Sequence, residues 1–252
     1  MSIPSVKRAI ISLAAQKFTS AAHPPLTHLD VGAGRGGLIA ELRKHFSFNS
    51  QACDFHTERF EPDVPITQVN FDQSPLPYPD NSFDFVTSAE VVEHLENYHH
   101  LIREVYRVLK PNGLFIVTTP NVLNMKSRVR ILLTGFPALF DPLPIKGSEL
   151  YSSGHHITPI PYFYLAHALA DADFINLRYV GDKAQKTSLL WLALLWPFLG
   201  IGWALFWLIK TRKGTITKGN RQITLDCASW KTLTSRTVIV AAEKSSSGQG
   251  DA

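Results

Sequence analysis

The fold of this chain is decided by the stretch LDVGAGRGG at residues 29–37. Apolar residues on both sides of Asp30 indicate the end of a strand, and the glycines that follow indicate a tight turn that opens a helix over residues 38–46. Glycine is used where the backbone takes a positive φ or approaches a ligand closely. The first N–H groups of a helix also lack partners within the helix. We therefore expect the floor of a cofactor site at Gly32, Gly34 and Gly36.

The glycine spacing alone leaves the cofactor open. Gly32, Gly34 and Gly37 match the pattern G-x-G-x-x-G, the fingerprint of dinucleotide binding, which by itself is only a hypothesis. A dinucleotide-dependent oxidoreductase is therefore one alternative. Residues outside the turn must distinguish between the possible cofactors.

Composition favours a single domain over residues 1–252. With 45% hydrophobic residues, the chain can bury a sizeable core. Its formal charge is +4, but the basic residues are scattered except at 126–130 and 210–221, so we expect no nucleic-acid partner. The two cysteines, Cys53 and Cys227, lack the spacing of a disulfide framework or a thiolate zinc site and fit a reducing cytoplasm.

Strand and helix patterns alternate along the first half of the chain. Residues 5–18 are predicted to form a helix that packs on the domain rather than a cleaved signal. Apolar runs predict strands at residues 48–53, 66–71, 83–87 and 114–118, and helices at 89–97 and 99–110. This alternation favours a parallel sheet with right-handed crossovers.

Four further blocks of sequence resolve the cofactor. They are LPYPDNSFD (76–84), EVVEHL (90–95), RVLKPNG (107–113) and TPN (119–121), in that order after the glycine turn. Together they resemble the class I S-adenosylmethionine-dependent methyltransferases, and are most similar to the small-molecule branch that includes the ubiquinone-pathway O-methyltransferases. A dehydrogenase would not be expected to carry these blocks. The resemblance covers residues 28–121 and implies S-adenosyl-L-methionine as the cofactor.

The resemblance also implies an architecture. It predicts an α/β fold with a Rossmann-like, doubly wound, seven-stranded sheet, in which a strand at 237–242 inserts antiparallel between strand five and a strand at 174–180. Residues 122–156 are too long for a simple connection, so we expect them to form a substrate-cover insertion after strand five. The polar tail at 245–252 is expected to be disordered.

Each cofactor-facing residue has an implied role. Asp30 would orient the methionine end of the cofactor, and Asp54 would accept hydrogen bonds from the two ribose hydroxyls. Asp72 would take the exocyclic amine of the adenine, while Phe71 covers its ring. Asp84 lies within the sheet rather than at its carboxyl edge, so we expect it to be structural. With the glycine turn, the predicted cofactor set is Asp30, Gly32, Gly34, Gly36, Asp54, Phe71, Asp72 and Ala89.

The reaction implied is attack by a nucleophile on a methyl carbon already activated by the sulfonium. A base is needed only where the acceptor is a hydroxyl of high pKa. The candidate catalytic residues are His94, Glu93 and His156, with His155 as a further candidate in the same loop.

Glu90, Glu93 and His94 also predict a tentative metal site. Offsets of three and four residues would place them on one face of a helix, and the resemblance associates this Glu-x-x-Glu-His pattern with magnesium. The alternative is that acidic residues favour a helix start through its dipole. A divalent metal such as Mg²⁺ is thus possible but not required.

A long apolar stretch predicts contact with a membrane. Residues 188–209 carry no charge and hold four of the five tryptophans, a length that suffices to cross a bilayer once. Basic residues flank the stretch on both sides, which favours keeping both ends in the cytoplasm. A single crossing would also leave the last strand on the far side. We therefore predict that the insertion at 186–213 is a monotopic hairpin or in-plane helix pair on the cytoplasmic face of a membrane, with a bend near Pro197, Gly200 and Gly202.

Other interpretations of the chain stay open. A single membrane span, or a buried soluble helix, is the alternative to the hairpin. A non-catalytic, membrane-attached module is the alternative to an enzyme. A methyltransferase at a membrane is expected to meet a small-molecule acceptor with a lipid tail, such as a polyprenyl quinone precursor, another lipid or a lipid-linked sugar. The sequence does not choose among these acceptors and does not set the oligomeric state.

Overall fold

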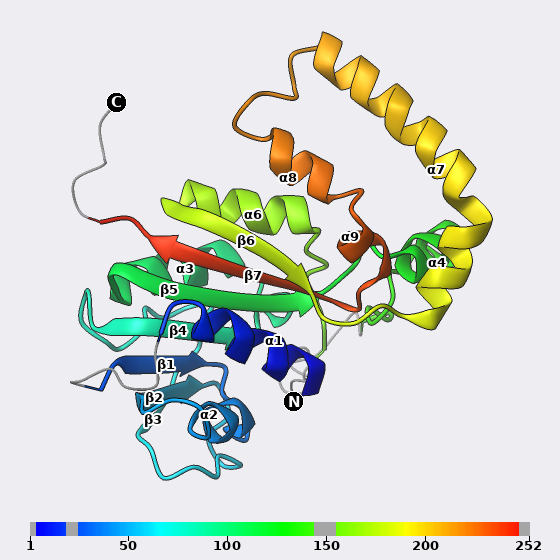
Figure 1. Cartoon of the computed structure of the whole chain (residues 1–252). Coiled ribbons are helices and arrows are strands. Elements are labelled where there is room, and N and C mark those ends of the chain that lie inside the picture. The colour runs from blue at the N-terminus through cyan, green and yellow to red at the C-terminus, as the bar shows by residue number, and fades with distance from the viewer. Residues whose placement is uncertain (1–3, 19–24, 144–154, 247–252) are drawn as a thin grey trace.

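A computed structural model describes residues 4–18, 25–143 and 155–246 of the protein. Its strands form one sheet in the order β3-β2-β1-β4-β5-β7-β6 (Figure 1). Strand β7 pairs antiparallel with both β5 and β6, and the other pairs are parallel. The predicted doubly wound sheet with an antiparallel last strand is confirmed. The strands are β1 (Thr27–Val31), β2 (Asn49–Asp54), β3 (Ile66–Gln68), β4 (Phe83–Ala89), β5 (Leu109–Pro120), β6 (Phe174–Gly181) and β7 (Thr237–Lys244).

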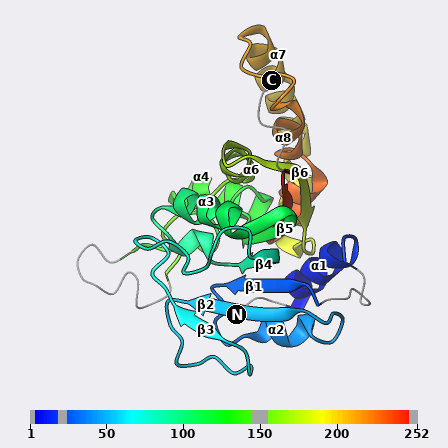
Figure 2. The same ribbon diagram turned by 90° about the vertical axis from the view of Figure 1, so that its left-hand side faces the viewer.

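Helices cover both faces of the sheet. Alternate residues of β5 point to opposite faces, so Ile116 packs with α1 and α2, whereas Phe115 packs with α3 and α6. Figure 2 shows that α7 and α8 extend beyond the sheet at the end away from β3. The helices are α1 (Pro4–Ala15), α2 (Gly37–Leu42), η1 (Val92–His94), α3 (Tyr98–Val108), α4 (Met125–Thr134), α6 (Tyr162–Asp171), α7 (Lys186–Arg212), α8 (Arg221–Asp226) and α9 (Trp230–Thr234).

The order of the strands reverses between β1 and β4, which lie side by side. In open α/β sheets, ligands bind at such a switch point, outside the carboxyl ends of the strands. The glycine turn follows β1 at this edge, and Glu90 follows β4. The topology thus brings the glycine turn and the block at residues 90–95 to the same edge of the sheet.

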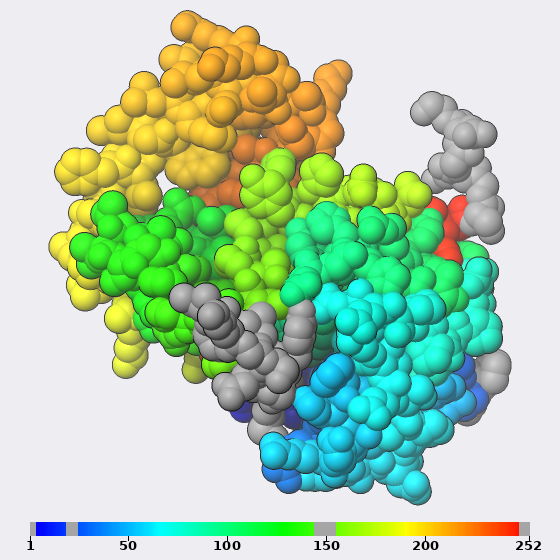
Figure 3. All heavy atoms as spheres, turned by 180° about the vertical axis from the view of Figure 1, so that it is seen from behind, coloured from blue at the N-terminus to red at the C-terminus, as the bar shows by residue number. Residues whose placement is uncertain are grey.

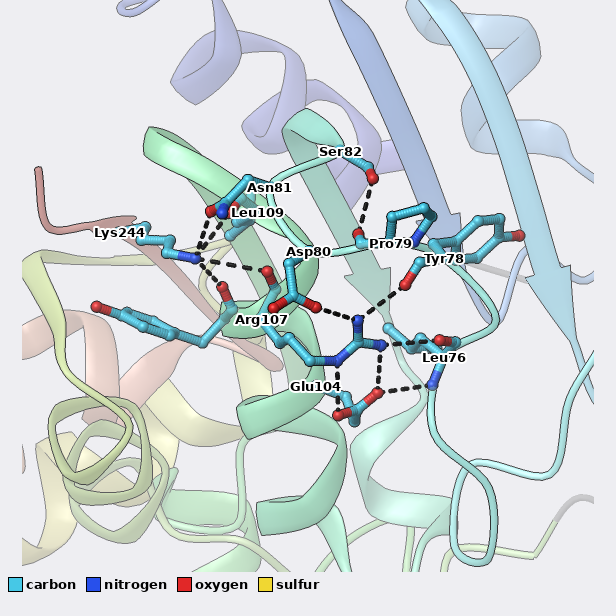
Figure 4. A network of polar contacts seen from close by, with 11 residues as sticks. Leu76, Tyr78, Pro79, Asp80, Asn81, Ser82, Glu104, Arg107, Leu109 and Lys244 are labelled. Carbon is cyan, nitrogen blue, oxygen red and sulfur yellow. Dashed lines mark hydrogen bonds and ion pairs between the residues drawn. The ribbon is translucent and has the colours of Figure 1, made fainter. Parts of the chain in front are cut away.

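The loop at residues 76–82 is fixed by Arg107 (Figure 4). All five N–H groups of its guanidinium donate: three to the carboxylates of Glu104 and Asp80, and two to the carbonyls of Leu76 and Tyr78, at 2.7–3.0 Å. Two blocks that carry the family resemblance therefore hold each other in place.

Two neighbouring side chains complete this structural network. Lys244 at the end of β7 donates to Asn81 Oδ1 and to the carbonyl of Leu109, both at 2.9 Å. Asp84 accepts from the backbone N–H of Thr27 (2.9 Å) and from Lys110 Nζ (2.8 Å). Asp84 is therefore structural, as predicted.

The helix predicted at residues 89–97 is wrong. Glu90 has a left-handed backbone (φ 59°), and its N–H donates to the carbonyl of Thr118 on β5 at 3.1 Å. This bond holds the backbone out of a helical path, and only the short η1 follows. The helix over 99–110 is also shorter than predicted, because the chain passes directly from α3 to β5 at Leu109.

The bend predicted near Pro197 is also wrong, because α7 runs as one helix of 27 residues. It is the one helix in the described residues that is long and apolar enough to cross a membrane, and none of its most apolar window is buried. Its start is tied to the domain: the N–H of Gln185 donates to the carbonyl of Thr234 (2.8 Å), and the N–H of Lys126 donates to the buried hydroxyl of Ser188 (3.3 Å).

Parts of two predicted segments lie outside the described residues. Of the predicted cover at 122–156, the structure describes α4 and the residues around it up to 143, together with 155 and 156. Of the predicted disordered tail, it describes residues 245 and 246.

Candidate active site

The glycine turn takes its shape from positive φ angles at Gly32 (71°), Gly34 (56°) and Gly36 (75°). A Cβ on Gly32 would lie 2.2 Å from Val91 Cγ2, so the turn packs directly against the loop after β4. A Cβ on Gly36 would lie 2.3 Å from the ring of Pro62. Gly36 is thus needed for packing within the turn.

Two cavities meet at this turn. The glycine-side cavity, of about 480 Å³, is lined by Asp30, Gly34 and Ala89 among others. The histidine-side cavity, of about 200 Å³, is lined by Phe71, Asp72, His94 and His155 among others. Four residues line both: Gly32, Asp54, His56 and Glu90. Every residue of the predicted cofactor set except Gly36 therefore lines this joint space.

Asp54 lies at the junction of the two cavities. Its Oδ2 accepts from the N–H of Gly34 (2.7 Å), and its Oδ1 accepts from the N–H of His56 (2.9 Å). These bonds fix the carboxylate at the carboxyl end of β2, next to the turn. Its remaining lone pairs are available to hydroxyl donors.

Asp30 is held in place by hydrogen bonds that link a series of buried polar side chains. Thr87 Oγ1 donates to Asp30 Oδ1 at 2.7 Å, and His28 Nε2 lies 3.0 Å from the same hydroxyl. Burial raises the pKa of Asp30 to about 7 and lowers the pKa of His28 to about 3. His28 is therefore neutral at neutral pH, and since the Thr87 hydrogen points to Asp30, the Nε2 of His28 carries the proton that Thr87 accepts.

Several residues that line the cavities were not predicted from the sequence. Lys7 of α1 donates to the carbonyl of Gly37 (2.8 Å) and lines the glycine-side cavity, although nothing local in the sequence marks it. His56 and Arg59 follow Asp54 in the loop after β2, and a position at the carboxyl edge of the sheet is a signal from which they could have been predicted. Asn70, Val91 and Leu95 line the histidine-side cavity.

The histidines of the two loops lie together beside the histidine-side cavity. The backbone carbonyl of Glu93 accepts from the N–H groups of Ile157 (2.9 Å) and Thr158 (3.0 Å), which brings the segment after residue 154 against η1. The rings of His94 and His156 then lie 4.8 Å apart between centroids. Residues 61 or more positions apart in the sequence thus share one wall.

Hydrogen bonds fix which nitrogens of these rings are free. His94 Nδ1 bonds the carbonyl of His155 (2.8 Å), and His156 Nδ1 bonds the carbonyl of Leu139 (2.7 Å). A carbonyl only accepts, so each Nδ1 carries the hydrogen and each Nε2 is left as a base when the ring is neutral. Burial lowers the pKa of both histidines, which favours the neutral form.

Glu93 lies beneath these two rings and is fully buried. Neither of its carboxyl oxygens has a hydrogen-bond partner among the described residues. Burial raises its pKa to about 8, so the carboxyl is protonated at neutral pH. Ligand atoms of Glu93, His94 and His156 all lie within 4.8 Å of one another.

The predicted metal set is assembled differently from the expectation. Without a helix, Glu90 does not join Glu93 and His94, and its Oε1 instead meets the hydroxyl of Thr237 at 3.4 Å. His156 takes its place in the cluster. One carboxyl and two imidazoles suit zinc, copper or iron, whereas magnesium prefers oxygen ligands.

Comparison with known proteins shows similarity to methyltransferases. Residues 29–117 match the family model described as a methyltransferase domain. A 2-methyl-6-phytyl-1,4-hydroquinone methyltransferase of Synechocystis sp. is 36% identical over 39% of this chain and 33% of its own length. A demethylmenaquinone methyltransferase of Listeria welshimeri is 34% identical over 45% of this chain and 50% of its own length.

The match to these curated relatives thus spans between a third and a half of their length. A solved S-adenosylmethionine-dependent methyltransferase from Archaeoglobus fulgidus has the same fold, with a TM-score of 0.56 over 94% of both chains and 14% identity. The matched residues 29–117 contain the glycine turn, Asp54, Asp72 and His94. From the motifs, the sheet and these matches, residues 29–117 form a methyltransferase domain, and the chain has the fold of, and is similar to, the S-adenosylmethionine-dependent methyltransferases.

Proposed function

We propose that this protein transfers a methyl group from S-adenosyl-L-methionine to a hydroxyl of a lipid-like or lipid-linked acceptor at a membrane surface. One observation carries the proposal. The histidine-side cavity has Asp54, Asp72 and Phe71 on its walls together with His94. A cofactor held by the first three residues and a basic nitrogen for the acceptor therefore share one space.

The cofactor supplies the activated methyl group, and this chain supplies alignment. Asp54 binds the ribose hydroxyls, and Asp72 with the buried Phe71 receives the adenine. Asp30, held by Thr87, faces the methionine end over Gly32. The cationic sulfonium and ammonium of the cofactor favour the ionised form of Asp30, whose pKa is about 7 without a ligand.

His94 is the proposed general base. It lines the cavity, its lowered pKa favours the neutral form, and its Nε2 has no hydrogen-bond partner among the described residues. His156 lies behind it with the same tautomer and is suited to pass the proton on. Glu93 is protonated at neutral pH, which makes it a hydrogen-bond donor toward this pair rather than the base. No step of this scheme uses a metal, and the cluster does not fit the magnesium that the family resemblance implies.

The membrane part of the proposal is supported by α7. Its apolar side chains are exposed, for example Phe198 (73%) and Trp196 (66%). Strand β7 follows α7 in the chain but pairs with β5 and β6, so both ends of α7 stay on the side of the sheet. Basic residues at both ends suit the headgroup region. These facts favour a helix that lies in the plane of one leaflet over a helix that spans.

The relatives give the acceptor class its support. One is named for a phytyl-bearing hydroquinone and the other for demethylmenaquinone. By analogy, the acceptor proposed here carries a hydrocarbon tail, which a protein resting on the bilayer through α7 meets in its membrane.

Replacement of Asp54 tests the cofactor assignment. Asp54→Ala removes the acceptor for two hydroxyls, and a charged hydrogen bond contributes about 1.5–3 kcal/mol. S-adenosylmethionine affinity in a calorimetric titration is expected to fall by at least about tenfold. The melting temperature is measured separately, because the variant also loses the hydrogen bonds from Gly34 and His56. Asp63→Ala, on the exposed loop after β2, is the matched control. Unchanged binding in Asp54→Ala removes Asp54 from the site, and binding of NAD in its place supports an oxidoreductase.

Labelling tests the reaction. The protein is incubated with methyl-labelled S-adenosylmethionine and a total lipid extract, and the labelled product is identified. His94→Gln is expected to lower the rate about 100-fold, the effect of losing a general base, with cofactor binding retained. His167→Gln, exposed on α6, is expected to leave the rate unchanged. A labelled product that is water-soluble contradicts the lipid part of the proposal.

A further inference from the structure

A groove lies between α4 and α7, outside the site described above. It has a volume of about 290 Å³ and is lined by Arg128, Phe198, Leu199, Gly202, Trp203 and Phe206. The α7 residues are spaced at i, i+1, i+4, i+5 and i+8, which places them on one face of the helix. Figure 3 shows α7 (yellow to orange) beside α4 (green) at this end of the molecule.

Arg128 brings a cation with unused donors to this apolar groove. Its Nε donates to the carbonyl of Leu123 (2.7 Å), and its Nη2 donates to the carbonyl of Cys227 (3.1 Å). A guanidinium has five N–H groups, so three have no partner within the described residues. No described carboxylate pairs with it, and Asp226, next to Cys227, pairs instead with Lys231 at 3.4 Å.

A second positive charge, that of Lys210, lies near one of the lining residues, Phe206. Lys210 Nζ lies 5.9 Å from the centre of the Phe206 ring. The described lining contains no acidic residue. A ligand that satisfies this surface needs an anionic group for Arg128 and a hydrocarbon chain for Phe198, Trp203 and Phe206.

We propose that the groove between α4 and α7 binds an anionic membrane lipid, with its phosphate on Arg128 and a hydrocarbon chain along α7. Phosphate offers oxygens in the geometry that a guanidinium fork matches. The proposal deepens the membrane association proposed above and rests on it. The occupant is a lipid of the bilayer on which α7 lies, and free phosphate lacks the chain that the apolar wall requires.

The groove is connected to the active site through α4. Next to Arg128, the hydroxyl of Ser127 accepts from the N–H of Ala138 (3.1 Å). The backbone carbonyl of the adjacent Leu139 accepts a hydrogen bond from Nδ1 of His156. A lipid bound at Arg128 therefore lies next to a path of contacts that leads to His156.

Vesicle flotation of the full chain tests the proposal. The probes are phosphatidylcholine vesicles and vesicles of phosphatidylcholine with phosphatidylglycerol. Wild-type protein is expected to bind the anionic vesicles more tightly, and Arg128→Gln is expected to lose about fivefold of that affinity, the usual effect of one basic residue at an anionic surface. Arg130→Gln is the matched control, because Arg130 of the same helix is already paired with Asp141.

A second pair of variants leaves the contacts of Arg128 in place. Gly202 lines the groove, and a Cβ there meets nothing within 4 Å, so Gly202→Leu fills the groove. Gly200 is equally open but does not line it, which makes Gly200→Leu the control. Leucine is a better helix former than glycine, so both variants are expected to fold. Only Gly202→Leu is expected to lose the preference for anionic vesicles.

The outcomes separate the two proposals. The groove proposal fails if Arg130→Gln loses as much affinity as Arg128→Gln, if Gly202→Leu behaves as wild type, or if inorganic phosphate displaces the protein from the vesicles. Binding to neutral vesicles without an anionic preference overturns the groove alone. Binding to neither kind of vesicle overturns the membrane association as well. Retained binding of S-adenosylmethionine in that case leaves the methyltransferase assignment standing.

Discussion

The regions around Arg107 and Arg128 use the same side chain in opposite ways. Arg107 donates all five N–H groups, and the neighbouring carboxylates of Glu104 and Asp80 raise its pKa (Figure 4). Arg128 donates twice to carbonyls only, and burial lowers its pKa. An arginine whose N–H groups all donate to the protein stabilises the fold, whereas an arginine with unused N–H groups has donors left for a ligand.

The same contrast separates two carboxylic acids. Asp84 accepts hydrogen bonds from Thr27 and Lys110, and its role is structural. Glu93 is fully buried and has no hydrogen-bond partner among the described residues. It lies directly beside the rings of His94 and His156. Unpaired buried polar groups cost stability, and in this protein they occur at the proposed site. The stability of variants at Arg107, Glu93, Arg128 and Arg130 tests whether pairing separates structural from functional residues.

The largest loss is expected at Arg107. Arg107→Gln breaks the bonds to two carboxylates and two carbonyls, and leaves Glu104 without its cation. We expect the free energy of unfolding to fall by about 3 kcal/mol, measured by urea denaturation. Arg103→Gln, exposed on the same helix, is expected to change it by less than about 0.5 kcal/mol. A loss as small at Arg107 as at Arg103 would break the comparison.

At Glu93 the expected change in the free energy of unfolding depends on pH. The folded state keeps the proton up to about pH 8, whereas the unfolded state loses it near 4.5. Between these values the folded state binds more protons, so wild-type stability falls as pH rises, by up to about 1.4 kcal/mol per pH unit. Glu93→Gln has no proton to lose, so its stability relative to wild type is expected to grow from pH 5 to pH 8.

Denaturation at a series of pH values measures this slope. Glu58→Gln, an exposed residue in the loop after β2, provides the control and is expected to follow the wild-type profile. A Glu93→Gln profile parallel to wild type across this range would mean that Glu93 is ionised in the folded protein, with a partner that its surroundings do not show.

A smaller stability effect is expected at Arg128 than at Arg107. Arg128→Gln loses two bonds to carbonyls but also relieves the burial of an unpaired charge. The net change in unfolding free energy is expected to stay within about 1 kcal/mol. A loss equal to that of Arg107→Gln would show that Arg128 mainly holds α4 to the end of α8, and would remove the basis for a ligand in the groove.

The parts of the fold that sequence predicts are those fixed by neighbours in the chain. The glycine turn, the strand ends at Asp54 and Ala89, and the antiparallel last strand all follow from contiguous motifs and their family resemblance. All of the predicted cofactor residues except Gly36 line the joint space of the two cavities, and Gly36 instead contacts Pro62, 26 positions away in the chain. That contact has no local signal.

Long-range contacts explain the remaining differences. The turn at Glu90 depends on Thr118 of the neighbouring strand, so the local pattern predicted a helix instead. Lys7 and His156 reach the site only through the packing of α1 and of the segment after residue 154. In α7, local chemistry predicted a bend at Pro197, but the helix continues through the proline.

The smallest effect is expected at Arg130, which completes the series. Its partner Asp141 is largely exposed (75%), and water competes for both charges. Exposed pairs contribute about 0–1 kcal/mol and weaken with salt, so Arg130→Gln is expected to cost less than about 0.5 kcal/mol in low salt and nothing measurable in high salt. Urea denaturation at two salt concentrations checks this. If Arg130→Gln costs more than Arg128→Gln in both, pairing rather than burial governs the arginines of α4, and the open donors of Arg128 lose their significance as a lipid site.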